Sequence, residues 1–392
     1  MINEHAYHLG LNSSVIRDLH EYGQKRAAQI GPENVFDYSL GNPSLPTPAA
    51  VHDAIRDILS REEPLAIHSY TSAAGDLQAR QAIAADLNHR FCADVRAEDL
   101  FITCGAAPGL VAVFQALAAP GAQILAVAPY FPEYKPFAQS AGLCFKVIPA
   151  DIPRFQIRLD ALEEMLTAHT AAIILNSPNN PTGTVYTRDT LEKLAALLRK
   201  KAAQFGHPIY IIADEPYREL VYGDAQVSFI PNIYADTIVC YSYSKSLSLP
   251  GERIGYIYVP RQANQHTQLL TAIGGASRIM GHVCAPSLWQ KVIARCAHLG
   301  PDLQAYDRNR RTLAEALTRY GYEIAQPDGA FYLFVKAPGG DARAFSRKAM
   351  QQDLLLVPGD DFDCPGWLRL CYCVSYDTIV SSLPVFRKLV DG

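Results

Sequence analysis

"TIVCYSYSKSLSLPGERIGYIYV", residues 237–259, contains two apolar runs that flank a polar segment, and its one lysine, Lys245, lies just after the first run. Both runs are too apolar to keep one face in water, which is typical of strands buried on both faces. Similar runs occur at 123 (QILAVAP), 171 (AAIILN) and 208 (PIYIIAD). We therefore expect these segments to form one buried, largely parallel sheet.

Helical patterns fill several of the intervals between these runs. In LEKLAALLRKKAAQF, residues 191–205, Leu191, Leu194, Leu197 and Leu198 share one face and basic residues surround the rest. Such alternation predicts an α/β sheet with crossover helices. After about residue 290 the pattern changes to a long polar helix, the segment YEIAQPDGAFYLFVKA, a helix from Asp341, the strand WLRLCYCV and a final helix. This change predicts a second, smaller α+β domain.

Composition narrows the classes of function. The 392 residues are 49% hydrophobic with a formal net charge of −4, so a large core is expected and nucleic acid is not expected as a partner. No apolar run is long enough to span a bilayer and the first residues do not resemble a secretory leader, so we expect no membrane contact and a cytoplasmic location. Nine scattered cysteines predict reduced thiols, and the pair Cys371 and Cys373 lacks the neighbouring ligands of a metal site.

Polar residues follow the strands of the predicted sheet. Asn176, Asp214 and Lys245 lie at or just beyond the ends of successive apolar runs, and ligands of open α/β sheets bind beyond these ends. Each residue alone has an ordinary explanation, because Asp214 could cap a turn, Lys245 could be solvated and Arg253 could form a salt bridge. The order of these residues along the chain, within the motifs that surround them, distinguishes these ordinary explanations from a shared site.

The motifs NNPTG at 179, DEPY at 214, SYSK at 242 with Arg253 eight residues after the lysine, and GWLRLCY at 366 together resemble the aspartate aminotransferase family, class I/II of the fold-type-I pyridoxal phosphate enzymes. The stretches SSVIRDL at 13, DYSLGNPSLPTPAAVHDAI at 37 and HSYTSAAGDLQARQAIA at 68 are similar to that family as well. The resemblance implies a mostly parallel seven-stranded sheet sandwiched by helices, with a large domain over 48–288 and a smaller α+β domain formed by 1–47 and 289–392.

The resemblance also implies the cofactor, pyridoxal 5′-phosphate, and its ring contacts. Lys245 matches the lysine that holds the cofactor as a Schiff base and moves the substrate Cα proton. Asp214 matches the carboxylate that keeps the ring nitrogen protonated. Tyr217 and Asn180 match donors to the phenolic oxygen, and Phe131 matches the aromatic residue that stacks on the ring.

Four kinds of contact are implied for the phosphate. ITCGAAPGLVAVFQAL at 102 predicts a strand, a glycine turn and a helix whose first amides, at Ala106 and Ala107, point at the anion. Ser242 and Arg253 match further donors. Tyr70 matches a residue that reaches the phosphate of the neighbouring subunit, which implies a homodimer with shared active sites. The segment at 102 departs from the family pattern in two ways: it lacks a hydroxyl near Ala106 and Ala107, and its Pro108 has no backbone N–H to donate.

For the substrate, the resemblance assigns Arg369 as the bidentate clamp on the α-carboxylate and Gly41 and Asn42 as part of a closing N-terminal segment. The implied function is an aminotransferase of amino-acid metabolism that passes an amino group from an L-amino acid to a 2-oxo acid, 2-oxoglutarate above all, by ping-pong. Arg278 is a candidate for reading a distal carboxylate by region only.

Two alternatives stay open. LPGERIGY at 249 also resembles aminocyclopropane-carboxylate synthases, and carbon–sulfur lyases share the lysine and the aspartate. A cofactor-binding regulatory domain is a more remote alternative, disfavoured by the absence of a basic segment before residue 13.

Overall fold

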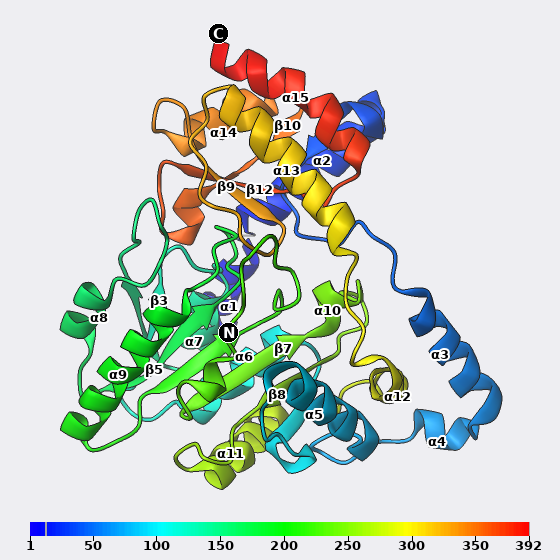
Figure 1. Ribbon diagram of the computed structural model, residues 1–392, viewed down its shortest axis with the longest axis vertical. Coiled ribbons are helices and arrows are strands. Elements are labelled where there is room, and N and C mark those ends of the chain that lie inside the picture. Colours follow the sequence, from blue (N-terminus) through cyan, green and yellow to red (C-terminus); the bar gives the residue numbers. More distant parts are fainter. Residues whose placement is uncertain (12–13, 392) are drawn as a thin grey trace.

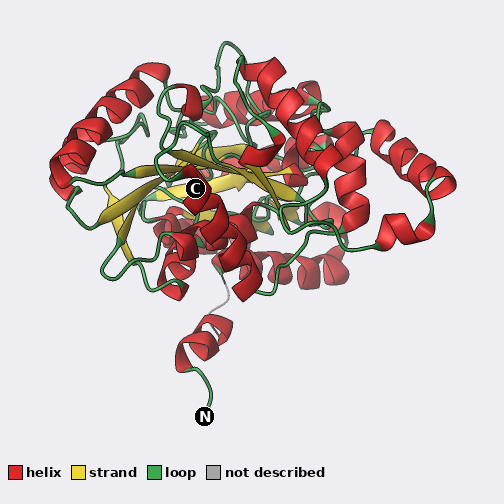
Figure 2. Cartoon of the chain, turned by 90° about the horizontal axis from the view of Figure 1, so that it is seen from below, coloured by secondary structure: helices red, strands yellow, loops and turns green. Residues whose placement is uncertain are grey.

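The computed structural model describes residues 1–11 and 14–391. Ser13, the first residue of the N-terminal motif SSVIRDL, lies outside the described residues. Most of the chain forms a large layered body, and a smaller part lies above it in Figure 1. The helix α1 (Glu4–Leu11) stands away from both, as Figure 2 shows.

The large body is built on a seven-stranded sheet, as predicted. The strands, in their spatial order, are β2 (Leu100–Thr103), β8 (Gly255–Tyr258), β7 (Thr237–Ser242), β6 (Tyr210–Asp214), β5 (Thr170–Asn176), β3 (Gln123–Val127) and β4 (Cys144–Ile148). Among these strands β8 alone is antiparallel to the other six. Every residue of β3, β6 and β7 is buried, which explains why their sequences are continuous apolar runs.

Helices cover both faces of this sheet, which confirms the predicted sandwich. One face packs on α3 (Ala49–Arg61), α5 (Leu77–Phe91), α8 (Leu159–Met165), α9 (Arg188–Phe205) and α12 (Ser287–Cys296). The other packs on α6 (Ala106–Ala116), α7 (Tyr134–Ser140) and α11 (His266–Ile279). The short α4 (Pro64–His68) and α10 (Tyr243–Ser246) complete the large body. On α9, Leu191, Leu194 and Leu198 are buried as the periodicity predicted, and the Thr187 hydroxyl caps its first turn.

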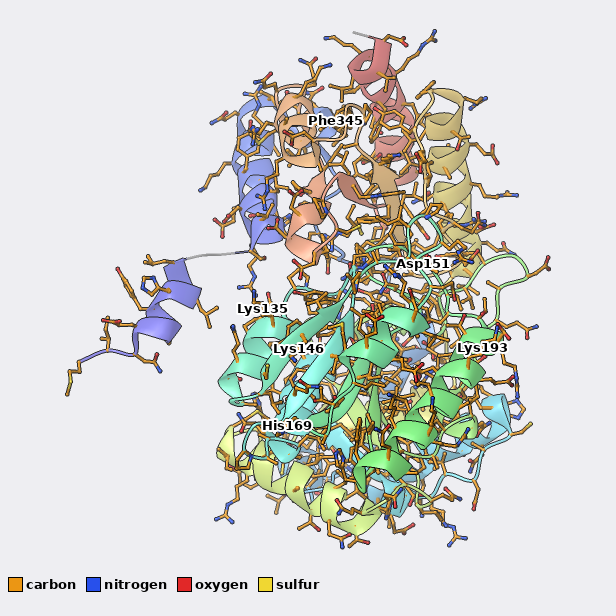
Figure 3. All side chains as sticks on the ribbon, turned by 90° about the vertical axis from the view of Figure 1, so that its left-hand side faces the viewer. Lys135, Lys146, Asp151, His169, Lys193 and Phe345 are labelled. Atoms are coloured by element: carbon orange, nitrogen blue, oxygen red, sulfur yellow. The ribbon has the colours of Figure 1, made fainter. Side chains whose placement is uncertain are left out.

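The smaller part is the predicted α+β unit. Its antiparallel sheet has the order β11 (Val357–Pro358), β12 (Trp367–Cys371) and β9 (Tyr332–Lys336), and β1 (Phe36–Asp37) pairs in parallel with β10 (Leu354–Leu355). The helices α2 (Val15–Ile30), α13 (Leu303–Arg319), α14 (Ala342–Met350) and α15 (Tyr376–Asp391) pack on these strands. Figure 3 shows Phe345 of α14 in this part and Lys146 of the edge strand β4 in the large body.

Short segments complete the description. Four 3₁₀ turns span Pro32–Asn34, Ala97–Asp99, Ile230–Asn232 and Gly359–Phe362. Over the described residues, no helix combines the length and apolar character needed to cross a membrane.

Candidate active site

A cavity of about 310 Å³ lies beyond the carboxyl ends of β5, β6 and β7 and is closed by residues of β9 and β12. Parallel register places Asn176 of β5 beside Asp214 of β6, so polar residues that are distant in sequence end at one edge of the sheet. The cavity brings together eleven of the predicted residues: Gly41, Ala106, Ala107, Phe131, Asn180, Asp214, Tyr217, Ser242, Lys245, Arg253 and Arg369.

Asp214 is a buried carboxylate with one partner. Its Oδ2 accepts a hydrogen bond of 2.5 Å from the hydroxyl of Tyr134, while its Oδ1 is buried without a partner. Burial raises the pKa of Asp214 to about 7, the Tyr134 hydrogen bond opposes the rise, and Glu215 adds to it. A buried carboxylate oxygen without a donor is costly, so Oδ1 is suited to a cationic N–H group in the cavity.

Lys245 lies on α10, directly after β7, and its amine enters the same cavity. Its Nζ donates to the carbonyl oxygen of Gly41 at 2.6 Å. Burial lowers the pKa of Lys245, and the charges of Arg369 and Arg253 act in the same direction while Cys373 and Cys371 oppose it. A lower pKa increases the fraction of neutral amine, which is the nucleophilic and basic form.

One end of the cavity is suited to an anion. The helix α6 begins at Ala106 after Gly105, and its first two residues, Ala106 and Ala107, line this end of the cavity, where the first amides of a helix favour an anion. A Cβ at Gly105 would lie 2.8 Å from Arg253 Nη2, so the absence of a side chain lets the guanidinium approach this turn. Ser242 Oγ lies 2.7 Å from Ser244 Oγ, and both serines line the cavity.

The other end is formed by the smaller sheet. Arg369 of β12 is buried, donates from Nη1 to Asn180 Oδ1 at 3.2 Å and from Nη2 to the carbonyl of Ser39, and leaves its Nε without a partner. Its guanidinium carbon lies 4.9 Å from the ring centre of Tyr332. Tyr332 in turn shares a 2.8 Å hydrogen bond with Tyr217. A buried guanidinium with an unused donor is suited to a carboxylate.

Comparison with known proteins identifies the family. The family model for aminotransferases of class I and II matches residues 33–380. The chain is 31% identical to the aspartate aminotransferase of Thermotoga maritima over 92% of each chain. It is 50% identical to an aminotransferase structure from Eubacterium rectale, with a TM-score of 0.97 over 100% of this chain and 98% of that one. An aspartate aminotransferase of Thermus thermophilus with maleate has a TM-score of 0.85 at 25% identity, over 96% and 97% of the two chains.

The chain belongs to the class I and II aminotransferases. The enzymes of this family depend on pyridoxal phosphate, and the aminotransferase carries groups that fit it. The partnerless Oδ1 of Asp214 fits the protonated ring nitrogen, and the α6 amides with Arg253 fit the phosphate. The three cations that line the cavity, Lys245, Arg253 and Arg369, outnumber its one carboxylate, Asp214, which suits two anionic groups.

Three residues singled out in the sequence lie elsewhere in the aminotransferase. Asn42 is exposed beside the cavity, and its carbonyl accepts from the Cys373 thiol. Tyr70 is 95% exposed and does not line the cavity of its own chain. Arg278 is exposed in the last turn of α11.

The sequence interpretation missed several residues that line the aminotransferase cavity or hold its lining. Tyr134 is the donor to Asp214, and burial keeps its pKa well above the ordinary value, so it stays protonated. The sequence pattern that could have indicated Tyr134 is its position three residues after Phe131, because Tyr134 begins a helix and residues three apart can lie on one side. Ile16, Leu40 and Tyr332 also line the cavity and had no polar pattern to mark them.

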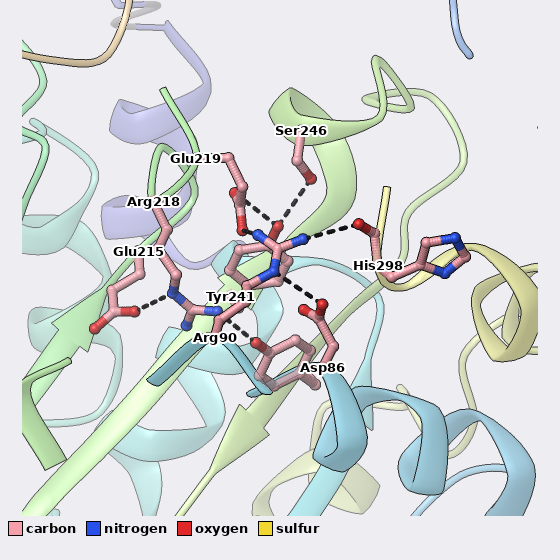
Figure 4. Close-up of polar contacts among 9 residues, drawn as sticks. Asp86, Arg90, Glu215, Arg218, Glu219, Tyr241, Ser246 and His298 are labelled. Atoms are coloured by element: carbon pink, nitrogen blue, oxygen red, sulfur yellow. Dashed lines mark hydrogen bonds and ion pairs between the residues drawn. The ribbon is translucent and has the colours of Figure 1, made fainter. Parts of the chain in front are cut away.

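A second missed feature is a buried ionic network behind the aminotransferase cavity, shown in Figure 4. Arg218 Nε donates to Glu215 Oε2 at 2.6 Å and Nη1 donates to the Tyr256 hydroxyl at 2.8 Å. Arg90 contacts Glu219 at 3.2 Å and Asp86 at 2.8 Å, and this group meets the first where the Arg218 guanidinium lies 4.5 Å from the ring centre of Tyr241.

The Tyr241 hydroxyl links this network to the reactive segment. It lies 2.9 Å from Glu219 Oε2 and 2.8 Å from Ser246 Oγ. Glu215 directly follows Asp214, and Ser246 directly follows Lys245. The network therefore holds the backbone next to Asp214 and Lys245 on the side away from the cavity.

Proposed function

We propose that the enzyme passes the amino group of an L-amino acid to a 2-oxo acid, with 2-oxoglutarate as the acceptor, in two half-reactions at one cavity. The observation that carries this proposal is the shared cavity of Lys245, the partnerless Oδ1 of Asp214 and the partnerless Nε of Arg369. When bound, pyridoxal phosphate accepts the electron pair released when a bond to the substrate Cα breaks.

Each residue has a distinct role in this proposal. Lys245 Nζ takes the proton from the substrate Cα and returns it, and its lowered pKa supplies the neutral amine. Asp214 holds positive charge at the ring nitrogen through Oδ1. Arg369 binds the substrate carboxylate through Nε and an Nη, and Asn180 orients the guanidinium. Tyr217 donates to the phenolic oxygen, and Phe131 packs on the ring.

The two ends of the cavity divide the remaining work. Ala106, Ala107, Ser242 and Arg253 bind the phosphate at one end. Gly41 and Asn42 belong to a segment that closes over the substrate at the other end of the cavity. The hydrogen bond from Lys245 to the Gly41 carbonyl connects this segment to the reactive lysine. We propose domains of 48–288 and of 1–47 with 289–392. The helix α12 extends the large domain past residue 288, because it packs on α3 and α5.

We also propose a homodimer in which Tyr70 reaches the partner's phosphate. Leu65, Tyr70, Ile279 and Val283 are 80%, 95%, 84% and 52% exposed, and exposed large apolar side chains of this kind can form a contact with a second subunit. The segments that carry them are linked by a 3.5 Å contact from Cys284 Sγ to the Thr71 carbonyl. Nine free cysteines in the described residues support a reducing compartment such as the cytoplasm.

A substrate panel tests the function. Purified enzyme is mixed with single L-amino acids, with and without 2-oxoglutarate, and the 2-oxo acid formed is followed over many turnovers. Sustained product only in the presence of the acceptor supports transamination. Product that accumulates without an acceptor would identify a lyase and would contradict the proposal.

Subunit complementation tests the dimer. Lys245→Ala and Tyr70→Ala subunits are mixed, unfolded and refolded together. If Tyr70 serves the partner, half of the dimers are mixed and each regains one intact site, so activity reaches about a quarter of the wild-type value. Activity no higher than the mean of the two parent variants would show that Tyr70 does not act across the interface.

A further inference from the structure

Two buried cysteines lie beside the active site and have no part in the proposed reaction. Cys371 ends β12 and Cys373 follows two residues later, and alternate residues of an extended chain share one face. Their sulfur atoms are 3.0 Å apart, and both are free thiols. A disulfide needs sulfurs at roughly 2 Å and Cα atoms within about 6.8 Å, and alternate residues of an extended strand lie roughly 6.6 Å apart. About 1 Å of sulfur movement, together with a local bend of the chain after β12, would therefore join them.

The surroundings shift the pKa values of the two thiols in opposite directions. Burial disfavours the thiolate of Cys371, but the hydrogen bond from Cys373 and the charges of Arg369 and Lys245 outweigh it and lower the pKa of Cys371. Burial and the hydrogen bond to Cys371 raise the pKa of Cys373. Cys371 is therefore the cysteine of the pair whose thiolate is the more favoured, and the thiolate is the nucleophilic form of cysteine.

The pair also holds the N-terminal segment against β12. The Cys373 thiol lies 3.1 Å from the Asn42 carbonyl oxygen, and the Cys371 amide donates to the Tyr38 carbonyl at 2.9 Å. Arg369, two residues before Cys371, donates to Ser39 in the same segment. The sulfur atoms thus contact the backbone that lies over the Arg369 guanidinium.

We propose that Cys371 and Cys373 form a redox-active dithiol whose oxidation by hydrogen peroxide to a disulfide weakens substrate binding at Arg369. Hydrogen peroxide is small enough to enter the 310 Å³ cavity beside which the pair lies. The disulfide itself follows from the sulfur geometry, whereas its effect on substrate rests on the proposed role of Arg369.

The chemistry balances in two steps. The Cys371 thiolate attacks one peroxide oxygen, the O–O bond breaks and hydroxide leaves, which gives a sulfenic acid. Cys373 then loses its proton and attacks the Cys371 sulfur, the S–O bond breaks and the second hydroxide leaves. Two protons convert the hydroxides to two waters, so two thiols are oxidised and one peroxide is reduced.

Disulfide formation removes two contacts. The one proton of the Cys373 thiol, which the Cys371 sulfur and the Asn42 carbonyl oxygen share, is lost, and the sulfur beside Arg369 and Lys245 can no longer carry a negative charge. The loss of one net hydrogen bond from the closing segment corresponds to an increase of roughly 5-fold in KM for the amino acid. We expect kcat to change less, because Lys245 and Asp214 keep their positions.

The test uses the holoenzyme and peroxide. After treatment, remaining thiols are alkylated under denaturing conditions and the peptide that contains both cysteines is weighed. We expect it to be unalkylated and about 2 Da lighter, the mass of two hydrogen atoms, and to be restored by a dithiol reductant together with KM. Cys371→Ser, which lacks the attacking sulfur, should show no peroxide-dependent rise in KM, while Cys144→Ser, at an exposed position, should respond as the wild type does.

Three results would overturn the proposal in distinguishable ways. Full alkylation of Cys371 and Cys373 at a peroxide dose that oxidises the exposed Cys92 and Cys144 would show that the pair is inert. An equal rise in KM in Cys371→Ser would place the sensitive group elsewhere. A disulfide that forms while KM stays constant would refute the link to Arg369 and leave the amino-transfer assay unaffected.

Discussion

Asp214→Asn should remove a pH-dependent loss of stability from the cofactor-free protein. In the folded chain burial raises the pKa of Asp214 from 3.8 to about 7. A carboxyl with a raised folded-state pKa contributes stability below its unfolded pKa, and that contribution is lost as pH rises through the folded pKa. Asparagine preserves the shape and the Tyr134 contact but carries no charge, so the variant lacks this loss.

The size of the effect comes from the two pKa values. A difference of roughly 3 pKa units corresponds to about 4 kcal/mol of lost stability once pH exceeds 8. About half of that loss falls between pH 5.5 and pH 8, because the unfolded carboxyl is already ionised over this range. The wild type should therefore lose about 2 kcal/mol more than Asp214→Asn between these two pH values.

Urea unfolding measures the difference. Both proteins are freed of cofactor and unfolded at pH 5.5 and pH 8 at one fixed protein concentration, because subunit association also affects stability. Asp224→Asn, at an exposed turn, is the matched control and should follow the wild type. Parallel pH profiles for the wild type and Asp214→Asn would refute the reasoning, since they would mean that Asp214 is not desolvated in the fold.

Three further predictions concern the neighbours of Asp214 and the carboxylate clamp. Tyr134→Phe removes the donor that stabilises the Asp214 anion, so cofactor affinity should fall roughly 5- to 10-fold at pH 8 and less at pH 6. Titration of the cofactor absorbance measures this affinity. An equal loss at both pH values would contradict the role of the hydrogen bond. Arg369→Lys loses the forked donor, so kcat/KM should fall roughly 30- to 150-fold, mainly through KM, and an unchanged KM would exclude Arg369 as the clamp. Arg218→Met leaves Glu215 buried without its cation and should cost about 3–5 kcal/mol in urea unfolding, whereas an effect no larger than that of the exposed Arg188→Met would show the network to be dispensable.

Sequence reasoning located the centre of the site because strand-end chemistry is local. An apolar run that stops at a polar residue marks both a buried strand and the edge where it ends, and this pattern predicted the positions of Asp214, Ser242 and Lys245. Glycine followed by a helical pattern likewise predicted the start of α6 at Ala106. The assignment of Arg369 to the same cavity came only from the family resemblance, because nothing local connects β12 to the large sheet.

The elements that were missed depend on long-range pairing. Arg218 and Arg90 resemble ordinary surface residues in sequence, and the burial of Arg218 and the partial burial of Arg90 follow from helices and strands that meet only in three dimensions. The edge strand β4 alternates exposed and partly buried residues over its first four positions and ends in the buried Ile148, which is too short a stretch for a clear period. Tyr70 contributes nothing to its own cavity, so neither the sequence pattern nor a single chain defines its contact.

The strand pair β1–β10 joins residues 36–37 to residues 354–355, whereas the large sheet is complete within residues 100–258. During synthesis on a ribosome, the groups around Asp214, Lys245 and Arg253 can therefore assemble while the β10 and β12 segments are still untranslated. The carboxylate-binding half joins last, when Arg369 has emerged. A nascent chain stalled before β12 should thus retain cofactor but be unable to turn over an amino acid.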